Sequence, residues 1–334
     1  MLYFNKRFQV YSRRIYVAVT AVRLATFNCE NLFARFKFNK GVDPNKALID
    51  GWLADKTNFT INDEESKKLT AKAISETKAD VIALQEVESL AALRRFRNIY
   101  LKGKGYDHII VLDGNDPRFI DVAVMSKYPI ENVDTHMQEW NKEIKWYTFS
   151  RDCLECDIVF SKDKRLRLFI NHFKSMFEKA DPCNGRKNSR KKRLIQTKRV
   201  KDIVQDEFPN GEGNYAVLGD FNDYLKSDSQ GATAIGQLVN WNKVENVINR
   251  LPYEEQWTHY YKGSSECGFP KTYKQLDYIL LSRTLADINS YIPVIIRKGL
   301  PNNADAYTGP RFEGVGNSAP KASDHCPVVI QINV

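Results

Sequence analysis

Residues 215–223 read YAVLGDFND and carry the clearest structural signal in the chain. The first residues are mostly apolar, which is typical of a strand that other elements cover on both faces. The stretch then turns polar at Asp220 and Asn222. A packed core would reject such side chains, but carboxylates and amides are good ligands for metal ions and phosphates. We therefore expect a buried strand that ends at a polar site.

The same pattern recurs along the chain. Strand-like runs occupy residues 22–28, 80–87, 108–112, 121–126, 167–171, 215–221, 275–282 and 327–334. Several end in polar side chains, namely Asn28, Glu30, Gln85, Glu86, Asn171 and His172. Apolar residues at helical spacing predict helices over residues 64–78 and 189–207. The alternation predicts a layered α/β domain. Because no repeat or long linker divides the chain, we expect an N-terminal extension of residues 1–21 and one domain over residues 22–334.

Six short segments together resemble the endonuclease/exonuclease/phosphatase superfamily, which includes deoxyribonuclease I, exonuclease III-type AP endonucleases, bacterial sphingomyelinases and inositol phosphatases. They read ATFNCENLF (25–33), ALQEVE (83–88), FINHFKS (169–175), LGDFND (218–223), QLDYIL (275–280) and ASDHCP (322–327), and they follow the family's order. The resemblance implies an α/β (α+β) fold, a four-layer sandwich of two packed, mostly antiparallel β-sheets flanked by helices. Periodicity alone does not separate this fold from a parallel, doubly wound sheet.

The resemblance also implies a metal-dependent phosphodiesterase. Glu86 would be the main metal ligand, and Asn28 and Asp324 would support the site. The expected cofactor is Mg²⁺, with Mn²⁺ as a substitute, because a hard divalent cation prefers oxygen ligands and neutralises phosphate charge. Asn28 could instead simply cap the end of a strand.

Five further residues take catalytic roles by the same resemblance. Asp220 would orient or deprotonate the attacking water, and Asn222 would position water or phosphate. His325 would stabilise charge at the scissile phosphate, held by Asp277 through its other ring nitrogen. His172 would act near the leaving group as a proton donor. The alternatives are a turn role for Asp277 and a structural role for His172.

The net charge of +9 is concentrated in one segment. Residues 184–201 contain nine basic residues and no acidic one, and the rest of the chain is balanced at 41 basic and 41 acidic residues. Such a patch favours a polyanionic partner, although a solvated helix face would look the same. The candidate substrate-binding residues are Arg186, Lys187 and Arg190 in this segment, with Arg118 and Arg151 outside it. Arg118 and Arg151 could instead pair with Asp116 or Asp152.

These observations predict an endonuclease that hydrolyses DNA with little sequence specificity, because contacts to the backbone give affinity without base readout. RNA is a further candidate substrate, and a monomer is expected. Residues 85–88 read QEVE where exonuclease III-type enzymes usually read QETK, which weakens an AP-site-specific role. One alternative is a phosphoesterase of phospholipids or small phosphodiesters, which an exposed apolar hairpin would favour, and the sequence contains no run that predicts one. The other alternative is an inactive nucleic-acid-binding module.

The remaining features concern compartment and cysteines. No apolar run is long enough for a transmembrane helix. Residues 15–22 only loosely resemble a signal peptide, so a cytoplasmic protein is expected and secretion is the alternative. The six cysteines are scattered and are expected to be reduced. Cys153 and Cys156 form a CxxC motif, but no second pair completes a zinc site.

Overall fold

The computed structural model describes residues 20–32, 36–38, 59–61, 64–116, 118 and 120–334. The expected extension, residues 1–21, lies almost wholly outside the described residues. The first described strand, β1, begins at Ala21.

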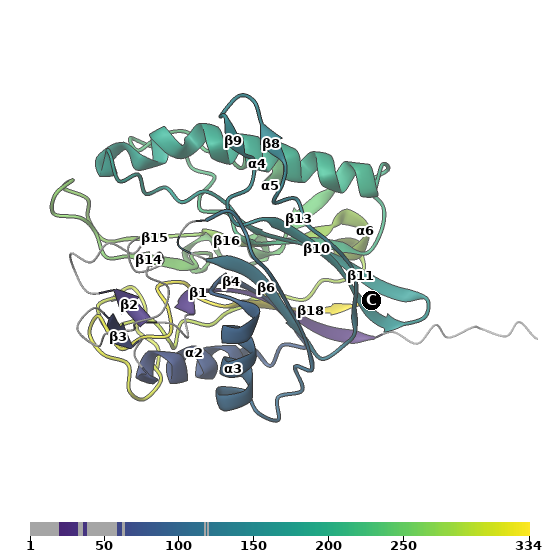
Figure 1. The fold of residues 1–334 in the computed structure, drawn as a ribbon, viewed down its shortest axis with the longest axis horizontal. Helices are drawn as coiled ribbons and strands as arrows, with labels where there is room; N and C mark the ends of the chain where they lie inside the picture. Colours follow the sequence, from purple (N-terminus) through teal and green to yellow (C-terminus); the bar gives the residue numbers. More distant parts are fainter. Residues whose placement is uncertain (1–19, 33–35, 39–58, 62–63, 117, 119) are drawn as a thin grey trace, which may run out of the picture.

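Two six-stranded sheets form the centre of the molecule (Figure 1). The first has the order β17 (Val294–Ile295), β18 (Val328–Asn333), β1 (Ala21–Leu32), β4 (Val81–Val87), β6 (Asp121–Ser126) and β5 (His108–Leu112). The second has the order β13 (Val244–Asn246), β16 (Asp277–Ser282), β12 (Tyr215–Asp220), β11 (Lys164–His172), β10 (Cys153–Ser161) and β7 (Ile130–Asp134). Neighbouring strands are antiparallel except for β1 with β4 and β11 with β12.

Helices cover the outer face of each sheet. Figure 1 shows α2 (Glu64–Thr77) and α3 (Leu90–Tyr100) on the side of the first sheet, and α4 (Gly185–Glu207) and α5 (Gly236–Val239) on the side of the second. The shorter helices are η1 (Pro182–Asn184), η2 (Val247–Arg250), η3 (Tyr253–Glu255) and α6 (Arg283–Asp287). Three small two-stranded sheets complete the described elements: β2–β3 (Phe36–Phe38, Phe59–Ile61), β8–β9 (Trp140–Asn141, Trp146–Tyr147) and β14–β15 (His259–Tyr261, Thr272–Lys274). The predicted four-layer sandwich is confirmed.

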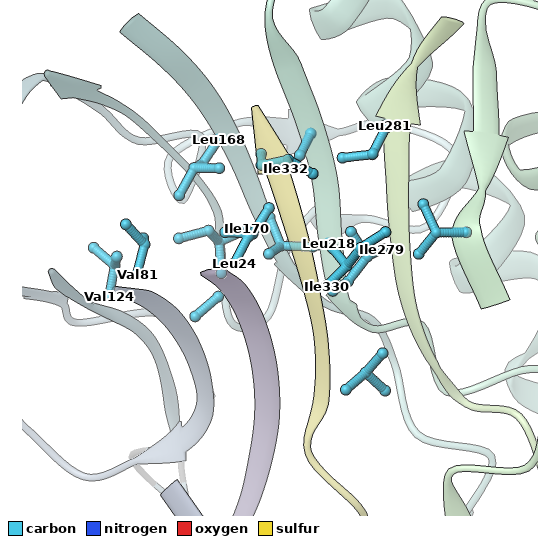
Figure 2. Close-up of a cluster of buried hydrophobic side chains, with 14 of the residues drawn as sticks. Leu24, Val81, Val124, Leu168, Ile170, Leu218, Ile279, Leu281, Ile330 and Ile332 are labelled. Carbon is cyan, nitrogen blue, oxygen red and sulfur yellow. The ribbon is translucent and has the colours of Figure 1, made fainter. Parts of the chain in front are cut away.

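Alternation along each strand divides the core into layers. In β1, Leu24 faces the second sheet, whereas Phe27 belongs to the layer under α2 and α3. Figure 2 shows Leu24 and Val81 of the first sheet opposite Leu168 and Leu218 of the second. All of these side chains are fully buried. Burial of each such side chain contributes about 1.5–3 kcal/mol to stability, so this layer holds the two sheets together. It thereby also fixes the positions of the strand ends that carry the polar residues.

Each strand-like run of the sequence corresponds to a strand, with small shifts at its ends. The main shift among the predicted helices is in α4, which begins at Gly185 rather than at the predicted Ser189. A glycine usually predicts a break, but here it is required by packing. A Cβ atom at Gly185 would lie 2.1 Å from the carbonyl oxygen of Met176.

The expectation that every cysteine is reduced is wrong. Cys183, just before α4, forms a disulfide with Cys267, and their Cα atoms are 5.2 Å apart across 84 residues of sequence. Because the two cysteines are so far apart in the sequence, no local motif indicated that they would pair. Cys153 and Cys156 are free and buried in different core layers, on opposite faces of β10, so their CxxC motif does not form a metal site.

Among the described residues, no helix has both the length and the apolar composition that crossing a membrane requires.

Candidate active site

The polar strand ends meet at one end of the sandwich. Asp220 ends β12, where its neighbours in register are His172 of β11 and Asp277 of β16. In the other sheet, Asn28 of β1 lies beside Gln85 of β4. The two sheets connect here through the side chain of Asn28, whose Nδ2 donates a hydrogen bond of 2.9 Å to Oδ2 of Asp220. Residues from five strands are therefore brought to one place.

Backbone irregularities direct the side chains at this end. The register of β4 shifts between Gln85 and Val87, so Glu86 is an extra residue in a bulge, with φ of 62°. Glu30, Asn31 and Asn222 also have positive φ. Such conformations cost about 1–3 kcal/mol each and concentrate at functional sites. The bulge aims the carboxylate of Glu86 across the strand end, where Oε2 accepts a hydrogen bond of 3.1 Å from the backbone N–H of Asn31.

The three predicted metal ligands lie around the same end of the first sheet. Oε1 of Glu86 is 3.5 Å from Nδ2 of Asn28. Asp324 precedes β18, and its backbone N–H donates to Oε2 of Glu30 at 2.9 Å. Burial and the charge of Asp324 raise the pKa of Glu86, and the same two causes raise the pKa of Glu30 to about 7, against the nearby ammonium of Lys321.

The proximity of these carboxylates indicates whether a metal ion suits the site. The partly buried carboxylates of Glu30 and Glu86 have raised pKa values because of that burial and because Asp324 lies near them, and a divalent cation would supply the positive charge that they lack. The oxygen donors of Glu86, Asp324 and Asn28 suit Mg²⁺ or Mn²⁺, so the residues fit the ion that the sequence predicts. A neighbouring group of His259, Asp324 and His325 places its ligand atoms within 4.8 Å of one another and could also hold a metal ion.

Asp277 and His325 form a buried pair. Nδ1 of His325 is 2.9 Å from Oδ2 of Asp277, which also accepts a hydrogen bond of 2.6 Å from the hydroxyl of Thr258. Burial lowers the pKa of His325, but the charges of Asp277 and Asp220 outweigh it and hold the pKa well above its usual value. These charges favour the protonated form of His325, and its Nε2 lies 3.8 Å from Oδ2 of Asp220.

Asp220 is held by several donors. Its oxygens accept from the backbone N–H and the side-chain Nδ2 of Asn222, at 2.8 and 2.9 Å. Burial raises the pKa of Asp220 to about 7, against the opposing charge of His325. The preceding residue must be glycine, since Gly219 has φ of 131° and a Cβ atom there would lie 1.9 Å from the carbonyl oxygen of Asn171.

His172 lies on the other side of Asp220, with Nε2 at 3.5 Å from Oδ2 and at 3.9 Å from Oε1 of Glu86. Burial and the charge of Arg151 lower the pKa of His172 well below its usual value. The lowered pKa favours the neutral imidazole, and the role of His172 as a proton donor near the leaving group stays a prediction.

Arg118 and Arg151 border the site and share one carboxylate. Nε of Arg118 is 3.1 Å from Oδ1 of Asp116, and Nε of Arg151 is 2.9 Å from Oδ2. Arg151 is buried and also donates to the carbonyl oxygen of Phe173, the acceptor that Nδ2 of Asn222 uses. The alternative of ion pairing with Asp116 is thus present for both arginines, but it does not exclude contact with substrate.

The basic segment differs from its predicted role as a continuous patch. Arg186 is buried, and its guanidinium donates to Asp223, Asp228 and three backbone carbonyls. The prediction that Arg186 contacts substrate phosphate is corrected, because these partners hold its side chain inside the protein. The sequence does not reveal them. Arg190 donates to the carbonyls of Ala232 and Thr233, whereas Lys187 is exposed.

The structure also brings in residues that the sequence had not marked for the site. Glu30, Thr258 and His259 are examples, through the contacts described above. Glu30 is one of the polar strand ends that the sequence shows, but nothing in the sequence pointed to a role for it in the site. Thr258 and His259 lie outside the six segments, so no sequence signal pointed to them.

Comparison with known proteins agrees with the geometry. The model of the Endonuclease/Exonuclease/phosphatase family matches residues 23–333, whereas no curated protein matches the chain. Among solved structures, TDP2 from D. rerio, complexed with a single-strand DNA product, is 16% identical, with a TM-score of 0.53 over 94% of this chain and 100% of that one.

Two further structures show the same fold. An AP endonuclease from Archaeoglobus fulgidus is 16% identical, with a TM-score of 0.54 over 94% of this chain and 98% of that one. Beta toxin from Staphylococcus aureus is also 16% identical, with a TM-score of 0.57 over 92% and 98%. Identities this low establish the fold and not the substrate. On the strength of the family match over nearly its whole length, the chain belongs to the endonuclease/exonuclease/phosphatase family.

Proposed function

We propose that this protein is a divalent-metal-dependent phosphodiesterase and that DNA is its substrate, cut with little sequence preference. The observation that carries the proposal is the convergence of Glu86, Asp220 and the Asp277–His325 pair at one end of the sandwich. We further propose that residues 22–334 act as a single catalytic domain.

A divalent cation held by Glu86, Asp324 and Asn28 would neutralise charge on the phosphate oxygens. The protonated imidazole of His325, fixed by Asp277, donates a hydrogen bond to the phosphate as its negative charge grows. Asp220 has a pKa of about 7, which suits a group that accepts a proton from the attacking water near neutral pH. Asn222 holds Asp220 in position through its two hydrogen bonds.

The choice of nucleic acid rests on the exposed cations of α4. Lys187, Lys191 and Lys198 are exposed, and their spacing of four and seven residues places them on one helix face. Lys191 lies 3.0 Å from Glu143, but both side chains are largely exposed, so the pair is weak. Such a face can track a polyanionic backbone without reading bases. The DNA-bound TDP2 structure of the same fold supports this choice.

The test is the salt dependence of DNA binding and cleavage in a Lys187→Gln/Lys191→Gln/Lys198→Gln variant. Each lysine that contacts a phosphate should reduce the log–log salt slope by about 0.9. Cleavage at moderate salt should fall through affinity and equally for all DNA sequences. An unchanged slope and unchanged cleavage in a folded variant would remove the support for DNA.

One observation favours a second candidate, a phosphodiesterase acting at a lipid surface. The β8–β9 hairpin exposes Trp140 (55%) and Trp146 (48%), and tryptophan prefers the membrane interface. The sequence did not reveal this hairpin because charged residues separate the two tryptophans. Hydrolysis of phosphatidylcholine vesicles that is lost in Trp140→Ala/Trp146→Ala, with DNA left intact by the wild type, would favour this function instead.

A further inference from the structure

Lys192 is a basic residue of α4 that the catalytic arrangement does not use. It lies away from the exposed lysine face, and its Nζ points to the segment before β10, where it donates a hydrogen bond of 2.8 Å to the hydroxyl of Ser150. No acidic side chain within salt-bridge distance accompanies it among the residues that the structure describes. Burial and the charges of Arg151 and Lys174 lower the pKa of Lys192 to about 8.

The charges that act on Lys192 come from two cations, Arg151 and Lys174, and from one anion, Asp116. Asp116 is already bound by Arg118 and Arg151, and the charge of Glu86 also acts on both arginines. Lys174 adds to the positive charge at Lys192, although its own ammonium is engaged by the carbonyls of Ser175 and Phe177 and lies 3.6 Å from Glu178. A half-buried ammonium that lies near other cations and, among the described residues, has no ion pair of its own is unfavourable, and an anion that binds beside Lys192 would relieve that cost.

The backbone beneath these cations is fixed. Gly114 packs so closely that a Cβ atom would lie 2.9 Å from the carbonyl oxygen of Ser150 and 3.0 Å from Cα of Arg151. Asp152 has φ of 75° and accepts hydrogen bonds from the backbone N–H groups of His136 and Cys153. The guanidinium of Arg151 is therefore presented from a rigid support, which lowers the entropy cost of binding, and the ammonium of Lys192 is tied to the same segment through its hydrogen bond to Ser150.

The cluster is adjacent to the catalytic group. Arg151 and Asn222 donate to the same carbonyl oxygen, that of Phe173, at 2.9 and 3.2 Å, and Asn222 holds Asp220 directly. The side chain of Arg118 is 58% exposed and Lys192 is partly exposed, whereas Arg151 is buried between them. A ligand that reaches the scissile position can thus extend over these cations.

We propose that Arg118, Arg151 and Lys192 form a subsite for a second phosphate, the one next to the scissile phosphate in a polynucleotide. This inference rests on the proposed function and specifies its substrate class, because a small diester or a phosphocholine lipid carries one phosphate. Arg151 forms the floor of the subsite, and Lys192 is the residue that distinguishes a substrate with a flanking phosphate from one without.

The test compares Lys192→Gln with a matched control, Lys201→Gln, which removes a lysine of the same helix whose ammonium lies over the ring of Trp241. The measured quantity is the ratio of kcat/KM for a DNA oligonucleotide to kcat/KM for bis(4-nitrophenyl) phosphate. Loss of one charge-assisted hydrogen bond should lower this ratio about 10-fold or more in Lys192→Gln and leave it at the wild-type value in Lys201→Gln. Equal ratios in the two variants would overturn the subsite.

Two further measurements separate this inference from the proposed function. Replacing the flanking phosphate by a neutral methylphosphonate, on either side in turn, should weaken cleavage by the wild type at one position and change Lys192→Gln little. Fluorescence anisotropy with the oligonucleotide in EDTA tests binding without catalysis, and Lys192→Gln should bind about 10-fold more weakly than Lys201→Gln. A wild type that binds through Lys192 but cuts no oligonucleotide would refute the DNase function and keep the subsite. A wild type that cuts DNA with no difference between the variants would refute the subsite alone.

Discussion

Replacing Asp277 by asparagine tests the catalytic arrangement with little change of shape. Oδ2 of Asp277 accepts hydrogen bonds from His325 and Thr258, and Oδ1 has no partner among the described residues. An asparagine can keep its oxygen at the Oδ2 position, and its NH₂ group then occupies the place of Oδ1, where it finds no acceptor. We expect the variant to fold, at a cost of about 1–3 kcal/mol for the unpaired donor.

The effect on catalysis should exceed the effect on folding. The charge of Asp277 is the foremost of the influences that keep His325 protonated despite its burial. Without it the pKa of His325 falls, and the hydrogen bond to the developing phosphate charge weakens. Removal of one preorganised donor of this kind costs about 10²–10³ in kcat, and the same range applies to Asp277→Asn.

The assay is kcat for a chromogenic diester in Asp277→Asn, His325→Ala and the double variant, with thermal unfolding as the control for folding. Two residues that act as one unit give non-additive losses. Asp277→Asn should therefore cost nearly as much as His325→Ala, and the double variant should be little worse than either. Fully multiplicative losses would show that the two residues act independently and would refute the reasoning.

Two further predictions concern stability rather than chemistry. Arg186→Gln should destabilise the protein by about 3–5 kcal/mol, because it removes the nearer cation of both Asp223 and Asp228 and leaves Arg193 and Lys274 at 3.5 and 3.9 Å. The adjacent exposed Lys187→Gln should change the unfolding free energy by less than about 0.5 kcal/mol. Chemical denaturation measures both, and similar values would contradict the buried network. His136 lies between Glu139 and Glu155 at 2.7 and 2.5 Å, and although burial opposes it, these hydrogen bonds raise its pKa to about 9. The protonated imidazole therefore stabilises the fold. This contribution is fully present at a pH below the unfolded-state pKa of about 6.5, and it is lost as the pH rises through about 9. The stability difference between wild type and His136→Asn should therefore shrink between pH 6.5 and pH 9, and a difference that stays constant would contradict the assignment.

The sequence predicted the strands well because their signal is local. An apolar run that ends in a carboxylate or an amide shows both the buried strand and the polar end, as Tyr215–Asp220 illustrates. The pairing of Asp277 with His325 across 48 residues is different in kind. No local pattern encodes it, and it could be expected only from the resemblance to the family.

The failures have a common physical cause, which is that partners distant in sequence decide what a side chain does. Arg186 lies in a run of basic residues in the sequence, but its ion pairs with Asp223 and Asp228 hold its side chain inside the protein. Cys183 forms a disulfide with Cys267, which lies 84 residues away in the sequence. The left-handed conformation of Glu86 arises from a bulge between strands, and a bulge cannot be read from one strand alone.

The most direct test of the central claim is the metal dependence of DNA hydrolysis in wild type and Glu86→Gln. Glutamine keeps the shape of the side chain and removes its charge, so the thermal unfolding of the variant should stay close to that of the wild type. We predict that the wild type cuts plasmid DNA only with Mg²⁺ or Mn²⁺, loses activity in EDTA and regains it when the metal is restored, and that Glu86→Gln is at least about 10²-fold slower at saturating metal. Hydrolysis that persists in EDTA, or a folded Glu86→Gln variant with wild-type activity, would contradict the account.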